Sequence, residues 1–205
     1  YTSEKKVKEQ KIIAGTASAQ FDALKNQLDP HFLFNSLNVL TSLIEENPQA
    51  ATRFTTSLSK VYRYVLEQKN KELVTVEEEL RFAKIYMSLI EMRFEDSIIF
   101  ETPENLSNPD AKVVPLSLQL LLENAVKHNQ VTPSRKLHIR IFEKDNNLVI
   151  ENNVQPKKVV KESSGVGLQN IRQRYYLLTD RPVQIQGDDK TFKVAIPMLT
   201  KQSKE

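Results

Sequence analysis

Apolar residues recur three and four positions apart along the first third of the chain, which is the spacing of helices with one buried face. Asn47-Pro48 interrupts this pattern as an N-cap followed by proline at the first helical position, so the pattern predicts two helices joined by a short connection. The recurring positions are Ala17, Phe21, Leu24, Leu28, Leu33, Leu37, Leu40 and Ile44, then Ala51, Phe54, Leu58, Val61 and Val65. A single hairpin cannot cover all of these faces, so a homodimeric four-helix bundle is expected.

The first of these helices contains a proline followed by a histidine. Pro30 removes one backbone hydrogen bond and predicts a kink. The apolar seam before it, continued by the same steps, reaches His31 and Asn35 one turn apart. Imidazole is largely neutral and nucleophilic near pH 7, so His31 is a candidate acceptor for a phosphoryl group. The alternative is a core histidine bonded to a neighbouring helix.

The rest of the chain, from about residue 71, mixes helical and alternating patterns. Thr75 to Glu78 forms a capping box that opens a helix, and further helices are expected over Pro115 to Asn129 and after Gly167. Strands are expected at Ile98 to Phe100, Leu137 to Ile141, Leu148 to Ile150, Val183 to Gln186 and Phe192 to Ile196. Helices among mainly antiparallel hairpins predict an α+β sandwich with the helices on one face of the sheet.

A second polar group lies on the helix expected at Pro115 to Asn129. Asn124, Lys127 and His128 are three and four residues apart, opposite an apolar face. An amide oxygen suits Mg²⁺, which usually binds together with substrate phosphates, and a lysine can neutralise those phosphates. A solvated helix face is the alternative for this spacing.

Glycines before the last helix offer a third candidate. Gly165 and Gly167 precede a helix whose N-terminus would attract negative charge, and glycine lets backbone amides approach an anion. Lys157, Lys158 and Lys161 lie just before them and could cover bound phosphates. An ordinary capped loop and a solvated charge run are the alternatives.

Composition limits the chemistry. The 205 residues are 40% hydrophobic and 27% charged, which is typical of a globular protein of one or two domains. The absence of cysteine excludes disulfides, zinc–thiolate sites and thiol catalysis. No apolar run is long enough to cross a membrane, and no signal peptide is found. The formal charge of +3, without a basic stripe rich in aromatics, does not indicate nucleic-acid binding. The charged start without methionine suggests a cut fragment.

Three segments, in order, resemble the LytS/YehU-type sensor histidine kinases. Asp29 to Asn38 resembles the phosphoacceptor segment of that family with its P-H-F-L-F-N core, and Leu122 to His128 is similar to its V-E-N-A-x-K-H segment. Gly165 to Arg174 is similar to its G-x-G-L-x-N-x-x-x-R segment. The resemblance covers roughly residues 20 to 197, and three ordered motifs make chance agreement very improbable.

The resemblance implies a dimerisation and histidine-phosphotransfer hairpin, expected over residues 1–70, followed by an ATP-binding domain of the GHKL type (gyrase, Hsp90, histidine kinase, MutL), expected over 71–205. It implies autophosphorylation from ATP and transfer to an aspartate of a response regulator, often one of LytTR type. The fragment would be the cytoplasmic region of an inner-membrane sensor and would not itself touch the membrane.

Carried over by position, the resemblance assigns roles to individual residues. His31 would be phosphorylated, with Asn35 able to polarise its ring. Asn124 would be the Mg²⁺ ligand, Lys127 and His128 phosphate neighbours, and Gly165 with Gly167 the flexible phosphate loop.

One position departs from the family. Where such kinases usually carry Asp-x-Gly to bind the adenine amino group, this chain has Asn152-Asn153-Val154. An asparagine oxygen can still accept from that amino group, but losing a charge-assisted bond costs about 1 kcal/mol. The alternative function is therefore a degenerate dimeric scaffold that signals without binding ATP. An ATPase or chaperone of the same superfamily would carry a glutamate four residues before Asn124, where this chain has Leu120, so steady-state hydrolysis is expected to be slow.

Overall fold

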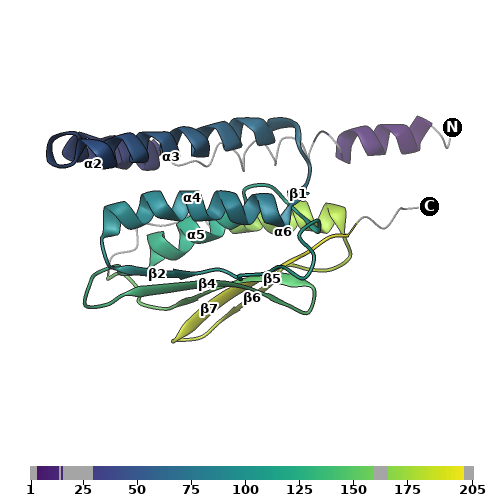
Figure 1. Ribbon diagram of the computed structural model, residues 1–205. Coiled ribbons are helices and arrows are strands. Elements are labelled where there is room, and N and C mark those ends of the chain that lie inside the picture. Colours follow the sequence, from purple (N-terminus) through teal and green to yellow (C-terminus); the bar gives the residue numbers. More distant parts are fainter. Residues whose placement is uncertain (1–3, 14, 16–29, 159–165, 201–205) are drawn as a thin grey trace.

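Three layers of secondary structure stack on one another in the computed structural model, which describes residues 4–13, 15, 30–158 and 166–200 (Figure 1). The first layer is a helical hairpin, the second a group of helices and the third a sheet. The hairpin is α2 (Pro30–Glu46) and α3 (Pro48–Glu67), followed by a short 3₁₀ helix, η1 (Gln68–Asn70). The second layer is α4 (Val76–Phe94), α5 (Ser117–His128) and α6 (Val166–Leu178).

The connection between α2 and α3 forms as its sequence predicts. The Asn47 side chain accepts a hydrogen bond from the backbone N–H of Ala50 at 3.1 Å, and Pro48 occupies the first turn of α3. This cap supplies an acceptor to one of the N–H groups that a helix leaves unpaired at its start. Along α3 the predicted apolar positions up to Val61 are buried, and Val65 is half-buried. The hairpin therefore has one well-covered helix.

Helix α2 buries a different face from the one its leucines predict. Leu33, Leu37 and Ile44 are 40%, 46% and 57% exposed, whereas Ser36 is buried and Phe32 packs against the core. The reason is that α2 packs against α4 as well as α3, which turns the Phe32 face inward. The apolar seam over residues 17–28 lies outside the described residues, and so does the chain before Pro30 on which the expected kink depends.

The sheet has five strands in the order β2-β4-β5-β7-β6. These strands are β2 (Ile98–Glu101), β4 (Leu137–Lys144), β5 (Asn147–Asn153), β6 (Gln184–Gly187) and β7 (Thr191–Pro197). Strand β2 pairs in parallel with β4, and the other neighbours are antiparallel. A small second sheet joins β1 (Val74–Thr75) to β3 (Lys112–Val113), which the sequence patterns did not predict.

The turn between β4 and β5 has the backbone conformation of a tight hairpin turn. Asp145 and Asn146 have φ values of 52° and 58°, the left-handed pair that a two-residue hairpin turn of type I′ requires. The short polar side chains of aspartate and asparagine tolerate this conformation better than other residues. The turn fixes the register in which Ile139 lies opposite Asn152.

The core lies between the sheet and the second helix layer. Alternate residues of β4 and β5, among them Ile139, Ile141 and Ile150, are buried together with Leu118 and Leu122 of α5. Figure 1 shows α4, α5 and α6 on one side of the sheet. The α+β sandwich with helices on one sheet face is thus confirmed. Among the described residues, no helix is both long and apolar enough to cross a membrane.

Candidate active site

A cavity of about 250 Å³ lies between the hairpin and the second helix layer, and His31 lines it. His31 and Asn35 come from α2, Arg93 from the end of α4, Glu123 and Lys127 from α5, and Lys157 from the segment after β5. The apolar part of the lining is Phe32, Val39, Phe54, Tyr86, Leu89, Ile90, Phe94 and Val126. His31 is exposed, so the cavity places an accessible imidazole beside several charged side chains.

Aromatic contacts fix the hairpin against α4 next to this cavity. The ring of Phe32 stacks on Tyr86 with centroids 5.2 Å apart, and Tyr64 of α3 stacks on Phe82 at 4.1 Å. Phe82 and Tyr86 also contact each other at 6.2 Å. Stacked pairs of this kind add about 0.5–1.5 kcal/mol each beyond the area they bury. Both helices of the hairpin are therefore tied to the same face of α4.

Helix α5 presents its polar residues in two directions. Lys127 is exposed and lines the cavity of His31, while Asn124 is half-buried and does not line it. Burial lowers the pKa of His128, and the charges of Lys127 and Lys157 lower it further. His128 is therefore neutral at pH 7 and can donate or accept a hydrogen bond.

The residues of α5 fit a Mg²⁺–nucleotide complex. Within the part of the chain that the structure describes, no group of three or more histidines, cysteines and carboxylates is placed to hold a metal ion. Mg²⁺ commonly binds through one or two protein oxygens together with substrate phosphates, and a half-buried asparagine amide is such a ligand. Asn124 is thus suited to a metal that arrives with its phosphates.

Asn152, the position that departs from the family pattern, lies on the helix-covered face of the sheet. It is 5% exposed and shares a face of β5 with Leu148 and Ile150. Its Nδ2 donates to the backbone oxygen of Asn153 at 2.8 Å. This bond uses the Nδ2 donor and leaves Oδ1 as the acceptor of the amide.

The glycine motif is described only in part. Gly167 lies in the first turn of α6 and is half-buried, whereas Gly165 lies outside the described residues. Of the lysines before it, Lys157 lines the cavity and Lys158 is exposed, and Lys161 also lies outside the described residues. Of the two glycines of the predicted phosphate loop, the structure therefore describes only Gly167, at the start of α6.

A buried glutamate that the motifs did not single out joins three helices. Glu79 of α4 has no exposed surface, and its Oε2 accepts a hydrogen bond from the Tyr64 hydroxyl at 2.7 Å. Its Oε1 accepts from the backbone N–H of Leu118 in the first turn of α5 at 3.2 Å. Burial raises the pKa of Glu79 to about 7 despite these bonds. The only sequence signal was its helical spacing from Val76 and Ala83, which puts it on the inner face.

Asn129, directly after α5, connects that helix to the segment after β5. Its Nδ2 donates to the backbone oxygen of Ala125 at 2.8 Å, and its Oδ1 accepts from the backbone N–H of Gln155 at 2.7 Å. The sequence motifs gave the Asn129 side chain no expected role. It holds the segment that carries Lys157 against the end of α5.

Comparisons with known proteins find similarity to histidine kinases and sensor proteins. A family model described as Histidine kinase matches residues 19–98. The chain is 28% identical to the sensor protein LytS of Enterococcus faecalis over 76% of this chain and 29% of that protein. It is 30% identical to the sensor histidine kinase YpdA of Escherichia coli over 78% of this chain and 30% of that protein. With the sensor protein kinase HptS of Staphylococcus aureus it shares 30% identity, over 76% of this chain and 28% of that protein.

These relatives are much longer than the chain, which spans less than a third of each. Among solved structures, the catalytic domain of the histidine kinase ThkA superposes with a TM-score of 0.42 at 16% identity, covering 63% of this chain and 97% of that domain. A bacterial phosphotransferase superposes with a TM-score of 0.45 at 12% identity, covering 89% of this chain and 96% of that structure.

Proposed function

The chain belongs to the histidine kinase family, and from this premise we propose that it is the kinase region of a two-component sensor that moves the γ-phosphoryl group of ATP onto His31. The observation that carries the proposal is the cavity in which an accessible histidine from α2 meets cationic side chains of α4 and α5. A nucleophile facing cations is the arrangement that phosphoryl transfer requires, because this reaction depends on positioning and charge stabilisation.

Each polar residue of the site then has one task. Asn124 would bind Mg²⁺, which would supply neutralisation of phosphate charge, while Lys127 and neutral His128 would contact the phosphates. Asn152 accepts a hydrogen bond from the adenine amino group. Gly165 and Gly167 let the backbone approach the phosphates at the start of α6.

Helix α2 supplies the histidine that accepts the phosphoryl group. The His31 imidazole attacks the γ-phosphorus through one ring nitrogen while its other nitrogen carries the proton, and Asn35, one turn later in the same cavity, can hydrogen-bond that ring. In a second step the phosphoryl group passes to an aspartate of a response regulator.

Similarity to histidine kinases also supports a proposal for the larger assembly. We propose that residues 1–70 form the dimerisation and phosphotransfer unit and residues 71–205 the ATP-binding domain. The printed names of the relatives describe sensors, so the chain is proposed to be the cytoplasmic part of a membrane-anchored sensor. Its partner would be a response regulator, for which the LytTR type is the first to test.

Replacing the acceptor tests the function directly. The chain incubated with Mg²⁺ and ATP labelled at the γ-phosphate should gain acid-labile label, because phosphohistidine hydrolyses in acid. His31→Ala should remove that label completely. The matched control is His138→Ala, since His138 is an exposed histidine on β4 outside the cavity, and it should keep the wild-type rate. Label that survives His31→Ala contradicts the assignment.

The alternative scaffold function predicts no nucleotide binding, and Asn152 discriminates the two. Under the kinase proposal, Asn152→Asp should tighten ATP binding about fivefold, because a carboxylate makes a charge-assisted bond worth about 1 kcal/mol more. Isothermal titration calorimetry measures both proteins. An absence of ATP binding at millimolar nucleotide by wild type and variant alike favours the scaffold.

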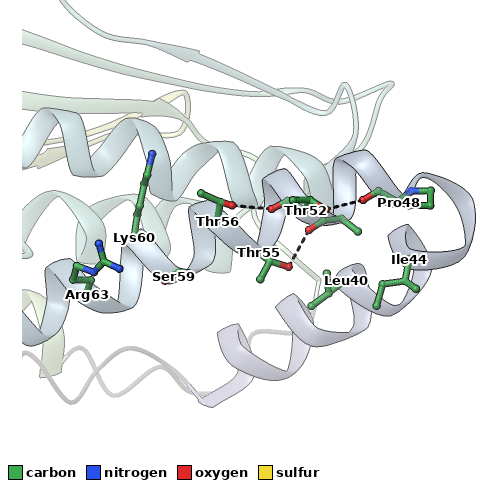
Figure 2. Close-up of a pocket in the computed structure, with 10 residues that line it drawn as sticks. Leu40, Ile44, Pro48, Thr52, Thr55, Thr56, Ser59, Lys60 and Arg63 are labelled. Atoms are coloured by element: carbon green, nitrogen blue, oxygen red, sulfur yellow. Dashed lines mark hydrogen bonds between the residues drawn. The ribbon is translucent and has the colours of Figure 1, made fainter.

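The exposed apolar face of the hairpin supports a homodimer. Figure 2 shows a groove between α2 and α3 in which Leu40 and Ile44 lie opposite threonines of α3, with Lys60 and Arg63 farther along that helix. The groove has a volume of about 590 Å³. Together with exposed Leu33 and Leu37 it forms an apolar surface that a second copy of the hairpin would cover.

A charge placed in this groove should break the dimer. Ile44→Asp would bury an unpaired carboxylate at the interface, so dimer dissociation should become about a hundredfold more favourable. Ser42→Asp adds the same charge at an exposed position of α2 that does not line the groove, and should leave the dimer intact. Sedimentation equilibrium decides, and a wild-type chain that is monomeric at high micromolar concentration refutes the proposal.

A further inference from the structure

The cavity that contains His31 has an excess of positive charge. Arg93, Lys127 and Lys157 line it, against the single carboxylate of Glu123. The Glu123 carboxylate is engaged by Gln119, whose Nε2 donates to Glu123 Oε2 at 2.7 Å. The charge of Arg93 also lowers the pKa of Lys157, after burial, so the two cations are close enough to repel each other. An anion in the cavity would relieve that repulsion.

The Arg93 guanidinium lines this cavity and forms no ion pair within residues 30–158 and 166–200, whereas Arg81, Arg140 and Arg174 each pair with a glutamate. Its guanidinium carbon lies 4.8 Å from the centroid of the Phe94 ring. Contact with the ring face stabilises the cation and restrains the guanidinium plane. The N–H groups at its edge can still bind oxygen atoms.

The planar guanidinium of Arg93 indicates which kind of anion would bind in the cavity. A restrained guanidinium binds two oxygens of a phosphoryl group through parallel N–H bonds, which an ammonium such as that of Lys127 or Lys157 cannot do. Arg93 comes from the last turn of α4, His31 from α2, and the two line the same cavity. A phosphoryl group that joins them would therefore be held against the imidazole.

We propose that Arg93 is a catalytic residue that anchors the phosphoryl group as it moves onto His31, a role that rests on the proposed kinase activity. A ring nitrogen of His31 forms a bond to the γ-phosphorus, and the bond from that phosphorus to the oxygen bridging it to ADP breaks, with its electron pair leaving on ADP. The proton of the other ring nitrogen passes to water. Arg93 binds the equatorial oxygens, where charge is spread in the transition state.

Kinetics of labelling test this role. Arg93→Gln should lower the rate of His31 phosphorylation about a hundredfold while changing ATP affinity less than threefold. Arg93→Lys, which keeps the charge but loses the bidentate geometry, should recover part of the rate. The matched control is Arg81→Gln, an exposed arginine of the same helix paired with Glu77, and it should behave as wild type. A wild-type rate in Arg93→Gln overturns the proposal, and so does a rate loss explained by ATP affinity alone.

A second measurement does not depend on ATP. Inorganic phosphate is titrated into the 205-residue chain labelled with ¹⁵N-histidine, and the His31 ring signals are followed by NMR. Wild type should show a saturable shift, and Arg93→Gln should weaken phosphate binding at least tenfold. Equal shifts in both proteins, or none in wild type, overturn the anchor role. If phosphate binding depends on Arg93 but the chain gains no label from ATP, the phosphate site is supported and the proposed kinase function is contradicted.

Discussion

An Asn124→Ala variant is expected to lose nucleotide-dependent labelling of His31 by a factor of about a thousand. The Asn124 amide is the side-chain oxygen that the proposed function assigns to Mg²⁺, and without the metal the triphosphate would lose both its position and the neutralisation of its charge. ATP affinity measured by calorimetry in the presence of Mg²⁺ should fall together with the labelling rate. Nucleotide binding without Mg²⁺ should be similar in wild type and variant.

The stability of Asn124→Ala separates this loss from misfolding. Asn124 is half-buried, so its replacement should change the free energy of unfolding by less than about 1 kcal/mol. Asn70→Ala serves as a matched control, because Asn70 is an exposed asparagine of η1 far from α5 in the chain. Wild-type labelling by Asn124→Ala would remove Asn124 from the site.

A Glu79→Ala variant is expected to lose about 3 kcal/mol of stability without any direct change to the site. It removes the acceptor of the Tyr64 hydroxyl and of the Leu118 N–H, and both donors stay buried without it. Leu116 precedes α5 in a left-handed conformation with φ of 65° and makes no side-chain cap, so Glu79 is the side chain that caps this helix. Urea unfolding followed by circular dichroism measures the loss. Glu77→Ala, an exposed neighbour, should change stability by less than about 0.5 kcal/mol.

The same carboxyl predicts a pH dependence. Burial raises the pKa of Glu79 from its ordinary 4.5 to about 7 in the folded chain, so between these values the folded state holds a proton that the unfolded state has released. The unfolded state binds fewer protons, and the stabilisation is complete below pH 4.5 and is lost as pH rises through 7. Burial also raises the pKa values of Tyr64 and Tyr175, which stay neutral over this range.

Comparison with Glu79→Ala isolates this effect. The unfolding free energy of wild type should fall with pH by up to about 1.4 kcal/mol per unit relative to the variant, over the interval from 4.5 to 7. Parallel pH profiles of the two proteins would show that Glu79 titrates alike in the folded and unfolded states.

Local sequence patterns predicted helices and strands well where the helix or strand buries a single face against a single neighbouring layer. The Asn47 cap, the Thr75 cap and the Asp145-Asn146 turn form as their residue types require, because each depends on bonds within a few residues. The helix opened by the Thr75 cap and the helix expected over Pro115 to Asn129 both form, as α4 and α5. Helix α2 was the exception. It packs against both α3 and α4, and the sequence alone does not show which of its apolar residues are buried there.

The sequence identified most residues of the candidate site but not how they are arranged in space. The motifs named His31, Asn35, Asn124 and Lys127, and the structure brings all of these except Asn124 to one cavity. No motif marks Arg93, and helical spacing places Glu79 on the inner face of its helix without giving it a role, because both act through contacts with helices far away in the sequence. Asn129 was hidden for the same reason, since its partner Gln155 lies across the fold.

The most direct test of the central claim is to locate the phosphoryl group. The chain is incubated with Mg²⁺ and ATP labelled either at the γ- or at the α-phosphate, digested without acid, and the peptides are sequenced by mass spectrometry. If His31 accepts the γ-phosphoryl group, the γ-label alone should be found, as phosphohistidine on the peptide that contains His31. Label from α-phosphate, or phosphorylation of any other residue in place of His31, would contradict the account.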